Sequence, residues 1–291
     1  MNPTPSTSPP PDLPIQNAMT CDVEDYFQVS AFAPHIDRSS WPVRECRVEA
    51  NVDRILYLMA HANVHATFFV LGWIAERYPA LIRRIVDAGH EVASHGYSHL
   101  RASEQDAATF SDDIVRSKGL LEDISGRPVV GYRAPSFSIS GANMWALDAI
   151  RRAGYRYSSS IYPIVHDHYG MPDAPRFAFY PSCTEGLLEV PITTVRLGNR
   201  NLPAGGGGYF RLLPYCLSRW MVRRVNTEDR QAAVFYFHPW EIDPGQPRPE
   251  GIGLKTRFRH YVNMSTMEAR LRHLAQDFRW ERMDRIFLHD T

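Results

Sequence analysis

The chain has 291 residues, of which 44% are hydrophobic and 22% charged, and its 32 basic and 32 acidic side chains give a formal net charge of zero. These proportions are ordinary for a soluble globular enzyme. Because there is no excess of positive charge, nothing in the balance favours nucleic acid or an anionic membrane as a partner.

The first 14 residues are rich in Pro, Ser and Thr and lack the basic region and apolar core of a signal peptide. We expect a disordered leader over residues 1–14 and a single domain over residues 15–291. No run of about 18 apolar residues occurs, so no integral membrane segment is expected. These features favour a cytoplasmic location, with peripheral contact to the inner membrane as the alternative.

From residue 15, short apolar runs alternate with amphipathic stretches, the pattern of parallel βαβ units. We expect strands at residues 18–22, 65–71, 91–94, 129–132, 155–159, 187–192 and 232–237. We expect helices at residues 52–62 after an Asn51 cap, 74–88, 103–124 with a capping box opened by Ser103, 142–153, 214–225 and 264–278. The Gly-rich residues 198–211 and the Pro-rich residues 243–249 are expected to be loops. About seven strands in one chain favour a barrel over an open sheet.

Four cysteines are widely spaced and form no CxxC pair: Cys21, Cys46, Cys183 and Cys216. In a chain of this length they indicate neither a disulfide framework nor a cysteine zinc site. We expect single buried thiols.

Polar side chains follow four of the predicted strands. Asp22, His95, Arg133 and His238 each stand at the carboxyl end of an apolar run. Since the active sites of parallel barrels lie at that rim, we expect these side chains to lie close together. A solvated turn or a packing histidine is the structural alternative at each position.

The metal-binding signal is a pair of histidines and a run of carboxylates. His95 and His99 stand four residues apart, and Asp22, Glu24 and Asp25 offer three carboxylates within four residues. Two histidines and one carboxylate can hold a zinc-type ion with open positions for water and substrate. A second carboxylate can act as general base, and Glu24 and Asp25 are both eligible as the ligand.

Further roles follow from position. Arg133 can orient the base carboxylate, and His238 can protonate a leaving group. Pro135 fixes the turn after Arg133, while Tyr209 and Trp240 bring aromatic rings near the rim, so we expect all three to contact substrate. A loop with no such role is the alternative for the Tyr209 segment.

The motifs resemble those of a known family. His95-Gly-Tyr-Ser-His99, Arg133-Ala-Pro135 and Phe237-His238, following the Asp22 run, resemble the NodB-homology polysaccharide deacetylases (carbohydrate esterase family four) over about residues 18–240. The runs DVEDYFQVSAF, GYRAPSFSI and FYFHPWEIDP resemble the branch found in exopolysaccharide loci linked to PEP-CTERM/exosortase systems. The resemblance implies an α/β fold, a distorted (β/α) barrel with about seven parallel strands, and a family-specific extension over about residues 241–291.

The resemblance also implies a role for each matching residue. Asp22 is the expected base, His95 and His99 the metal ligands, Arg133 the base-orienting arginine and His238 the general acid. The implied cofactor is a divalent metal, Zn2+ with Co2+ as the alternative.

Two departures from the family pattern leave roles open. The usual Asp-Asp pair is replaced, so spacing favours Glu24 as the metal carboxylate and adjacency favours Asp25. The Asp-Trp motif that orients the acid is replaced by residues 157–160, Tyr-Ser-Ser-Ser, which leaves Glu241 or Glu189 as a substitute.

The expected function is therefore a metal-dependent hydrolase that removes N-acetyl groups from an amino sugar. The expected partner is an N-acetylated glycan or its lipid-linked oligosaccharide precursor in exopolysaccharide biosynthesis. Hydrolysis of a small or cyclic amide, as in allantoinase-like relatives of the fold, is one alternative. A non-catalytic sugar-binding protein on the same barrel is the other.

Overall fold

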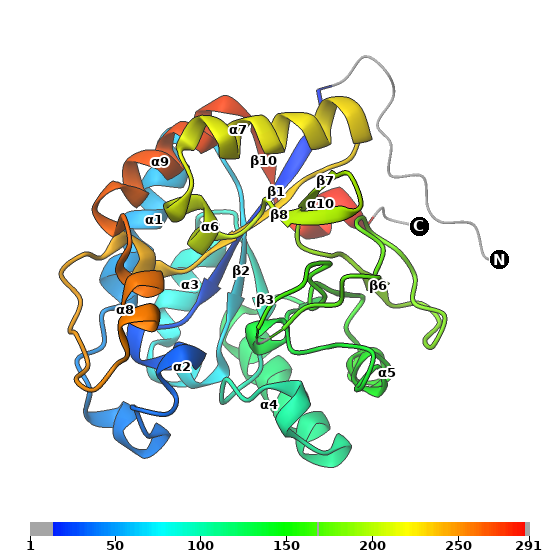
Figure 1. The fold of residues 1–291 in the computed structure, drawn as a ribbon. Coiled ribbons are helices and arrows are strands. Elements are labelled where there is room, and N and C mark those ends of the chain that lie inside the picture. The colour runs from blue at the N-terminus through cyan, green and yellow to red at the C-terminus, as the bar shows by residue number, and fades with distance from the viewer. Residues whose placement is uncertain (1–13, 168, 289–291) are drawn as a thin grey trace.

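The computed structural model describes residues 14–167 and 169–288, in which a curved parallel sheet is surrounded by helices (Figure 1). The strands are β1 Gln16–Val23, β2 Thr67–Val70, β3 Glu91–Ser94, β4 Gly131–Tyr132, β5 Tyr157–Ser158, β6 Leu188–Glu189, β7 Thr194–Leu197, β8 Arg200–Pro203, β9 Val234–Phe237 and β10 Arg279–Glu281. The helices are α1 Val48–Ala62, α2 Gly72–Arg77, α3 Pro79–Asp87, α4 Ala107–Ser125, α5 Trp145–Arg152, α6 Gly207–Leu212, α7 Tyr215–Arg224, α8 Leu254–Tyr261, α9 Met264–Asp277 and α10 Met283–Phe287. The expected leader lies outside the described residues except for Pro14.

The sheet has the topology of an incompletely closed barrel. Strands β1 to β6 follow one another as parallel neighbours, and β9 pairs with the other edge of β1. Strand β10 lies parallel to the first residues of β1, and β7 and β8 form a separate antiparallel hairpin. The expected distorted barrel of about seven parallel strands is confirmed.

Alternation along the strands separates the inside of the barrel from the helical layer. On β2, Phe68 belongs to the cluster that packs against the helices, and its neighbour Phe69 belongs to the cluster inside the barrel. On β1, Cys21 packs outward in the same way. Because successive strand residues face opposite sides, Asp22 faces the interior.

Two expected helix features are wrong for local reasons. The helix expected at 74–88 is divided into α2 and α3, because Pro79 lacks the N–H that a continuous helix needs and instead occupies the first position of a new one. Helix α4 begins at Ala107 with Asp106 as its cap, whereas Ser103 lies in a preceding short 3-10 turn. Its expected end is confirmed at Gly126, which has a φ of 64°.

The start of α1 could not be seen in its own sequence. Asn51 was expected to cap this helix but lies inside it. The helix is instead capped by Asp25, whose Oδ2 accepts from the backbone N–H groups of Arg47 and Val48. Asp25 lies 22 and 23 residues before these two positions. A long-range carboxylate has replaced the local cap.

The Gly-rich stretch is not the expected loop. Residues 198–211 contain β8 and most of α6, and Gly205 and Gly206 pass tightly against β9. A Cβ on Gly205 would overlap the carbonyl oxygen of Val234, whereas Gly208 has no atom within 4 Å of such a Cβ. The short elements α8, β10 and α10 were also not expected, while residues 243–249 contain no helix or strand, as predicted.

All four cysteines are free. Cys21 is buried and Cys46 half-buried, but Cys183 and Cys216 are exposed, so the expectation of buried thiols is wrong for those two. Among the described helices, none combines the length and apolar character needed to cross a bilayer.

A buried carboxylate connects α10 to the amino end of the barrel. Glu91 Oε2 accepts from Thr67 Oγ1 at 2.5 Å and from the backbone N–H of Asp284 at 3.2 Å, and Glu91 Oε1 accepts from the Tyr157 hydroxyl at 2.9 Å. Burial, followed by the nearby Asp284 charge, raises the pKa of Glu91 to about 8. The folded protein therefore retains a proton that the unfolded chain loses near its usual pKa.

We expect this carboxyl group to make the protein less stable as the pH rises. The contribution of Glu91 to the free energy of unfolding is fully present below about pH 4.5 and is lost as the pH rises through about 8. Each unit by which the folded and unfolded pKa values differ corresponds to ~1.4 kcal/mol of this contribution. In urea unfolding at pH 5 to 8.5, Glu91→Gln should therefore lose less stability than the wild type over that interval. The exposed Glu185→Gln should follow the wild type, and equal pH slopes for Glu91→Gln and the wild type would contradict the assignment.

Candidate active site

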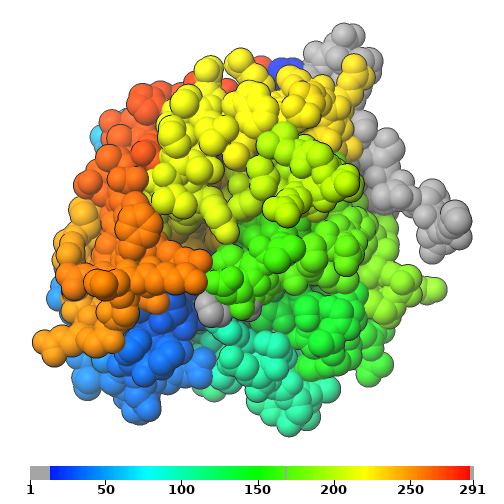
Figure 2. Space-filling view, viewed as in Figure 1, coloured from blue at the N-terminus to red at the C-terminus, as the bar shows by residue number. Residues whose placement is uncertain are grey.

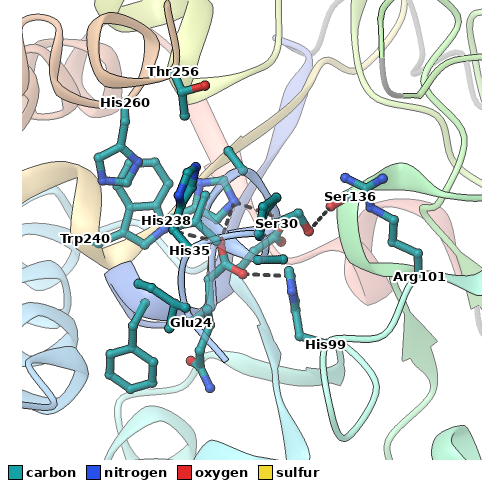
Figure 3. Close-up of a pocket in the computed structure, with 18 of the residues that line it drawn as sticks. Glu24, Ser30, His35, His99, Arg101, Ser136, His238, Trp240, Thr256 and His260 are labelled. Atoms are coloured by element: carbon teal, nitrogen blue, oxygen red, sulfur yellow. Dashed lines mark hydrogen bonds and ion pairs between the residues drawn. The ribbon is translucent and has the colours of Figure 1, made fainter. Parts of the chain in front are cut away.

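The carboxyl edge of the sheet gathers most of the residues expected there, and Figure 3 labels Glu24, His99 and His238 among them. Asp22 lies at the end of β1, His95 and His99 follow β3, Arg133 follows β4 and His238 follows β9. The side chains of the first four are at most 5% exposed, and that of His238 is 17% exposed. Charged groups are thus concentrated where water is largely excluded.

Arg133 is completely buried and fixes Asp22. Its Nη1 lies 2.5 Å from Asp22 Oδ1 and donates to Thr20 Oγ1 at 2.8 Å, while Nε and Nη2 donate to the carbonyl and hydroxyl oxygens of Ser159 at 3.2 and 3.0 Å. The guanidinium lies 4.0 Å from the centre of the Phe69 ring. The other Asp22 oxygen is left facing the site.

Glu24, His95 and His99 form the cluster able to hold a cation. One candidate ligand atom from each lies within 4.8 Å of the others. Glu24 Oε2 is buried and lies 2.7 Å from His99 Nε2, so the carboxylate and this imidazole of the cluster are in direct contact. His95 Nδ1 donates to the carbonyl oxygen of Arg133 at 2.9 Å, which leaves its Nε2 with a free lone pair. This donor set suits a divalent metal of the zinc type.

The charge states match that chemistry. Burial lowers the pKa of His95 to about 4, so its imidazole is neutral near pH 7. Burial alone would raise the pKa of Glu24, but the charges of His99 and then His238 outweigh it and lower the pKa to about 2. A neutral imidazole and an ionised carboxylate are the forms that bind a metal.

His238 stands opposite this cluster and is held from behind by Glu241. Its Nε2 lies 3.4 Å from Glu24 Oε1 and 4.0 Å from Asp22 Oδ2, and its Nδ1 lies 3.0 Å from Glu241 Oε1. Because an ionised carboxylate only accepts, Nδ1 carries a proton. Burial lowers the pKa of His238, but Glu24 and then Glu241 outweigh that effect and raise it to about 9.

Glu189, the other residue considered for orienting His238, has a different environment. Glu189 Oε1 accepts from the backbone N–H groups of Ser160 and Ile161, each at 2.8 Å. Ser160 Oγ in turn accepts from the backbone N–H of Ala134. Glu189 and the serines after β5 thus support the backbone around Arg133.

Trp240 contacts the cluster in a way that its sequence position did not suggest. Its Nε1 donates to Glu24 Oε1 at 3.2 Å, and its ring stacks between those of His238 and His260, with centroid separations of 5.0 and 4.3 Å. Figure 3 shows this column beside Glu24. His260 comes from α8 and was not singled out in the sequence, where no motif surrounds it.

Asp25 lies outside the cation cluster. Its Oδ2 accepts from Arg47 N, Val48 N and the Cys46 thiol, and its Oδ1 accepts from Tyr26 N. With both oxygens occupied, this carboxylate joins the turn after β1 to the start of α1.

A cavity of about 850 Å³ opens above the cluster. Its walls are formed by residues 27–41, α8 and the loop after β4. In Figure 2 the blue N-terminal, green central and orange C-terminal segments meet around a recess on this face. Trp240 lines the cavity together with Tyr236, whereas Pro135 and Tyr209 are not among its lining residues. Tyr209 lies in α6, and Pro135 is buried at the start of a 3-10 turn.

The wall after β4 has an unusual backbone. Ser136 and Phe137 are consecutive non-glycine residues with φ angles of 56° and 49°, a region that such residues rarely adopt. Ser136 Oγ lies 2.5 Å from Ser30 Oγ, so a hydrogen bond joins two walls of the cavity (Figure 3). Such strain is commonly held at functional sites.

Comparisons with known proteins agree with this geometry. Residues 40–158 match the family model described as polysaccharide deacetylase, and residues 159–288 match a domain of unknown function, DUF3473. The first of these two matches supports the polysaccharide deacetylase family. The deacetylase match contains His95, His99 and Arg133, whereas His238 and Glu241 lie in the second match.

Curated relatives match only part of this chain. A peptidoglycan deacetylase of Helicobacter pylori is 32% identical over 113 residues, which are 39% of this chain and 38% of that protein. A peptidoglycan deacetylase-like protein of Gibberella zeae is 30% identical over 38% of this chain and 32% of its own length. The matched segments thus span about a third of these relatives.

Solved structures extend the likeness of fold to nearly the whole chain. A Mycobacterium smegmatis protein assigned to the polysaccharide deacetylases has a TM-score of 0.61 at 21% identity, covering 95% of this chain and 93% of that one. Puue allantoinase has a TM-score of 0.60 at 14% identity, covering 97% and 90%. At these identities the likeness concerns the fold.

We expect Asp25 to be a stabilising residue. Asp25→Ala leaves three backbone N–H groups without their acceptor and should lower the free energy of unfolding by about 2–4 kcal/mol. Asp106→Ala, at the exposed cap of α4, should lower it by only about 1 kcal/mol. Urea denaturation measures both, and equal losses would show that Asp25 is no more than an ordinary cap.

Proposed function

We propose that this protein is a metal-dependent hydrolase that removes N-acetyl groups from an amino sugar in a polysaccharide or its precursor. The observation that carries the proposal is the meeting of the Glu24–His95–His99 cluster with an Arg133-held Asp22 and a Glu241-held His238 in one cavity. The match of residues 40–158 to the polysaccharide deacetylase model supports the same chemistry.

In this proposal Glu24, His95 and His99 hold the divalent ion, Zn2+ or Co2+. The close approach of the three candidate ligand atoms and the free Nε2 of His95 are the observations that favour these ligands. When bound, the ion supplies a Lewis acid that makes water more acidic and polarises the acetyl carbonyl.

The chain's own residues handle the protons. Asp22, oriented by the Arg133 guanidinium, takes the proton of the attacking water through the oxygen that faces the site. His238 presents Nε2 from the opposite side and gives its proton to the amine nitrogen as the C–N bond breaks. Acetate and a free amino sugar are the products.

Several features support a glycan as the substrate. The relatives with matching sequence are named peptidoglycan deacetylases, and the cavity is large enough for more than one sugar ring and carries aromatic faces at Trp41, Tyr169 and Tyr236. The resemblance to exopolysaccharide-locus proteins favours an exopolysaccharide or its lipid-linked precursor handled in the cytoplasm. Trp240 lies where it can contact this substrate, while contacts by Pro135 and Tyr209 stay predictions.

A metal-binding measurement distinguishes Glu24 from Asp25 as the carboxylate ligand. Glu24→Gln should lower the affinity for Co2+ by at least about tenfold, because it removes a charged ligand. Asp25→Asn should bind Co2+ like the wild type, as should the exposed Glu45→Gln. Absorption titration with Co2+ on protein shown to be folded by circular dichroism gives the answer, and loss of binding in Asp25→Asn alone would reverse the assignment.

An acetate-release assay tests the role of Asp22 as general base. Asp22→Asn should lower kcat for acetate release from N-acetylglucosamine oligomers by about 10²–10⁴-fold while Co2+ binding is retained, because the proton acceptor is lost and the ligands are not. The surface variant Asp53→Asn is the matched control. An unchanged rate would remove Asp22 from the mechanism, and hydrolysis of allantoin without acetate release by the wild type would favour the small-amide alternative.

A further inference from the structure

The Gly-rich start of α6 lies directly behind the proposed general acid. Glu241, which accepts from His238 Nδ1, is only 1% exposed, and its carboxylate lies against the Cα of Gly207. A Cβ added to Gly207 would overlap Glu241 Oε2 and lie 2.7 Å from both Cδ and Oε1. Any side chain at position 207 would therefore displace the whole carboxylate.

Position 207 requires glycine because a side chain would not fit there, and not because of its backbone conformation. Its φ does not fall in the left-handed region, so alanine can adopt the same conformation. The neighbouring Gly208 also has an ordinary φ, and a Cβ there would meet nothing within 4 Å. The two adjacent glycines thus have permissive backbones alike and differ in burial and in what a methyl group would touch.

Arg211, one turn further along α6, lies beside the same carboxylate. Its Nε lies 3.6 Å from Glu241 Oε2, and both atoms are buried without a hydrogen bond to any described residue. Its Nη1 donates to the carbonyl oxygens of His260 and Val262 at 2.6 and 2.9 Å. The guanidinium is thereby fixed at the end of α8, with Glu241 as the opposite charge beside it.

We propose that Gly207 and Arg211 are positioning residues for the general acid. Gly207 leaves the space in which the Glu241 carboxylate lies, and Arg211 holds that carboxylate by its charge. Glu241 in turn keeps His238 directed at Asp22 and Glu24. The inference rests on the function proposed above and assigns a role to a segment outside the deacetylase match.

The dependence on the leaving group provides the test. An N-acetyl amide needs a proton on its nitrogen as the C–N bond breaks, whereas 4-nitrophenyl acetate releases a stable phenolate without one. Gly207→Ala should therefore lower kcat for N-acetylglucosamine oligomers by about 10–10³-fold with little change in KM, and change kcat for the aryl ester by no more than about twofold. Gly208→Ala should resemble the wild type with both substrates.

Arg211→Lys gives a second variant if Gly207→Ala does not fold. It retains a positive charge but not the guanidinium contacts, and the same selective loss of amide hydrolysis is expected. Equal behaviour of Gly207→Ala and Gly208→Ala, or equal loss of amide and ester hydrolysis in folded variants, would overturn the inference.

A measurement without turnover distinguishes this inference from the proposed function. A ring N–H bonded to a carboxylate gives a strongly downfield proton resonance, which His238→Gln would assign. It should be present in the wild type and Gly208→Ala and be lost or shifted in Gly207→Ala and Arg211→Lys. If it persists in both of those variants, the inference fails whatever the activity. If it responds as expected but the wild type releases no acetate, the positioning role stands and the proposed function fails.

Discussion

The contact between Arg133 and Asp22 organises much of the site because both side chains are buried. Water cannot take the place of a lost hydrogen-bond partner there. The guanidinium donates to Thr20 on β1 and to Ser159 after β5, and its own backbone carbonyl accepts from His95. One residue thereby sets the direction of a carboxylate through its side chain and of an imidazole through its main chain. A buried cation is stable only when its donors are satisfied, so the serines after β5 are part of the same constraint.

The remaining buried charges follow the same rule of close opposite partners. Glu24 lies between His99 and His238, and Glu241 lies between His238 and Arg211. These contacts link the turn after β1, the loop after β3 and the end of β9 with α6. Packing supports the arrangement, since Trp240 fills the space between His238 and His260 and donates to Glu24 at the same time.

Much of the strand pattern was predictable because buried parallel strands are short apolar runs, and the polar residue that ends each run marks the rim. Local sequence did not reveal long-range partners. Asp25 caps a helix that starts more than 20 residues later, and Arg211 reaches Glu241 from a segment expected to be a loop. Spacing favours Glu24 but leaves Asp25 eligible, and it does not separate Glu241 from Glu189. The distant backbone N–H groups that occupy Asp25 and Glu189 are not visible in the sequence.

The two family matches meet at residues 158 and 159, immediately after β5, although strands from both sides belong to one sheet. β1 lies before this boundary and β9 after it, and they are direct neighbours. A cut of the chain at this point would divide neighbouring strands between two pieces, with Asp22 on one and His238 on the other. Each matched stretch therefore lacks part of the sheet and part of the site, and β1, which lies in neither match, joins them.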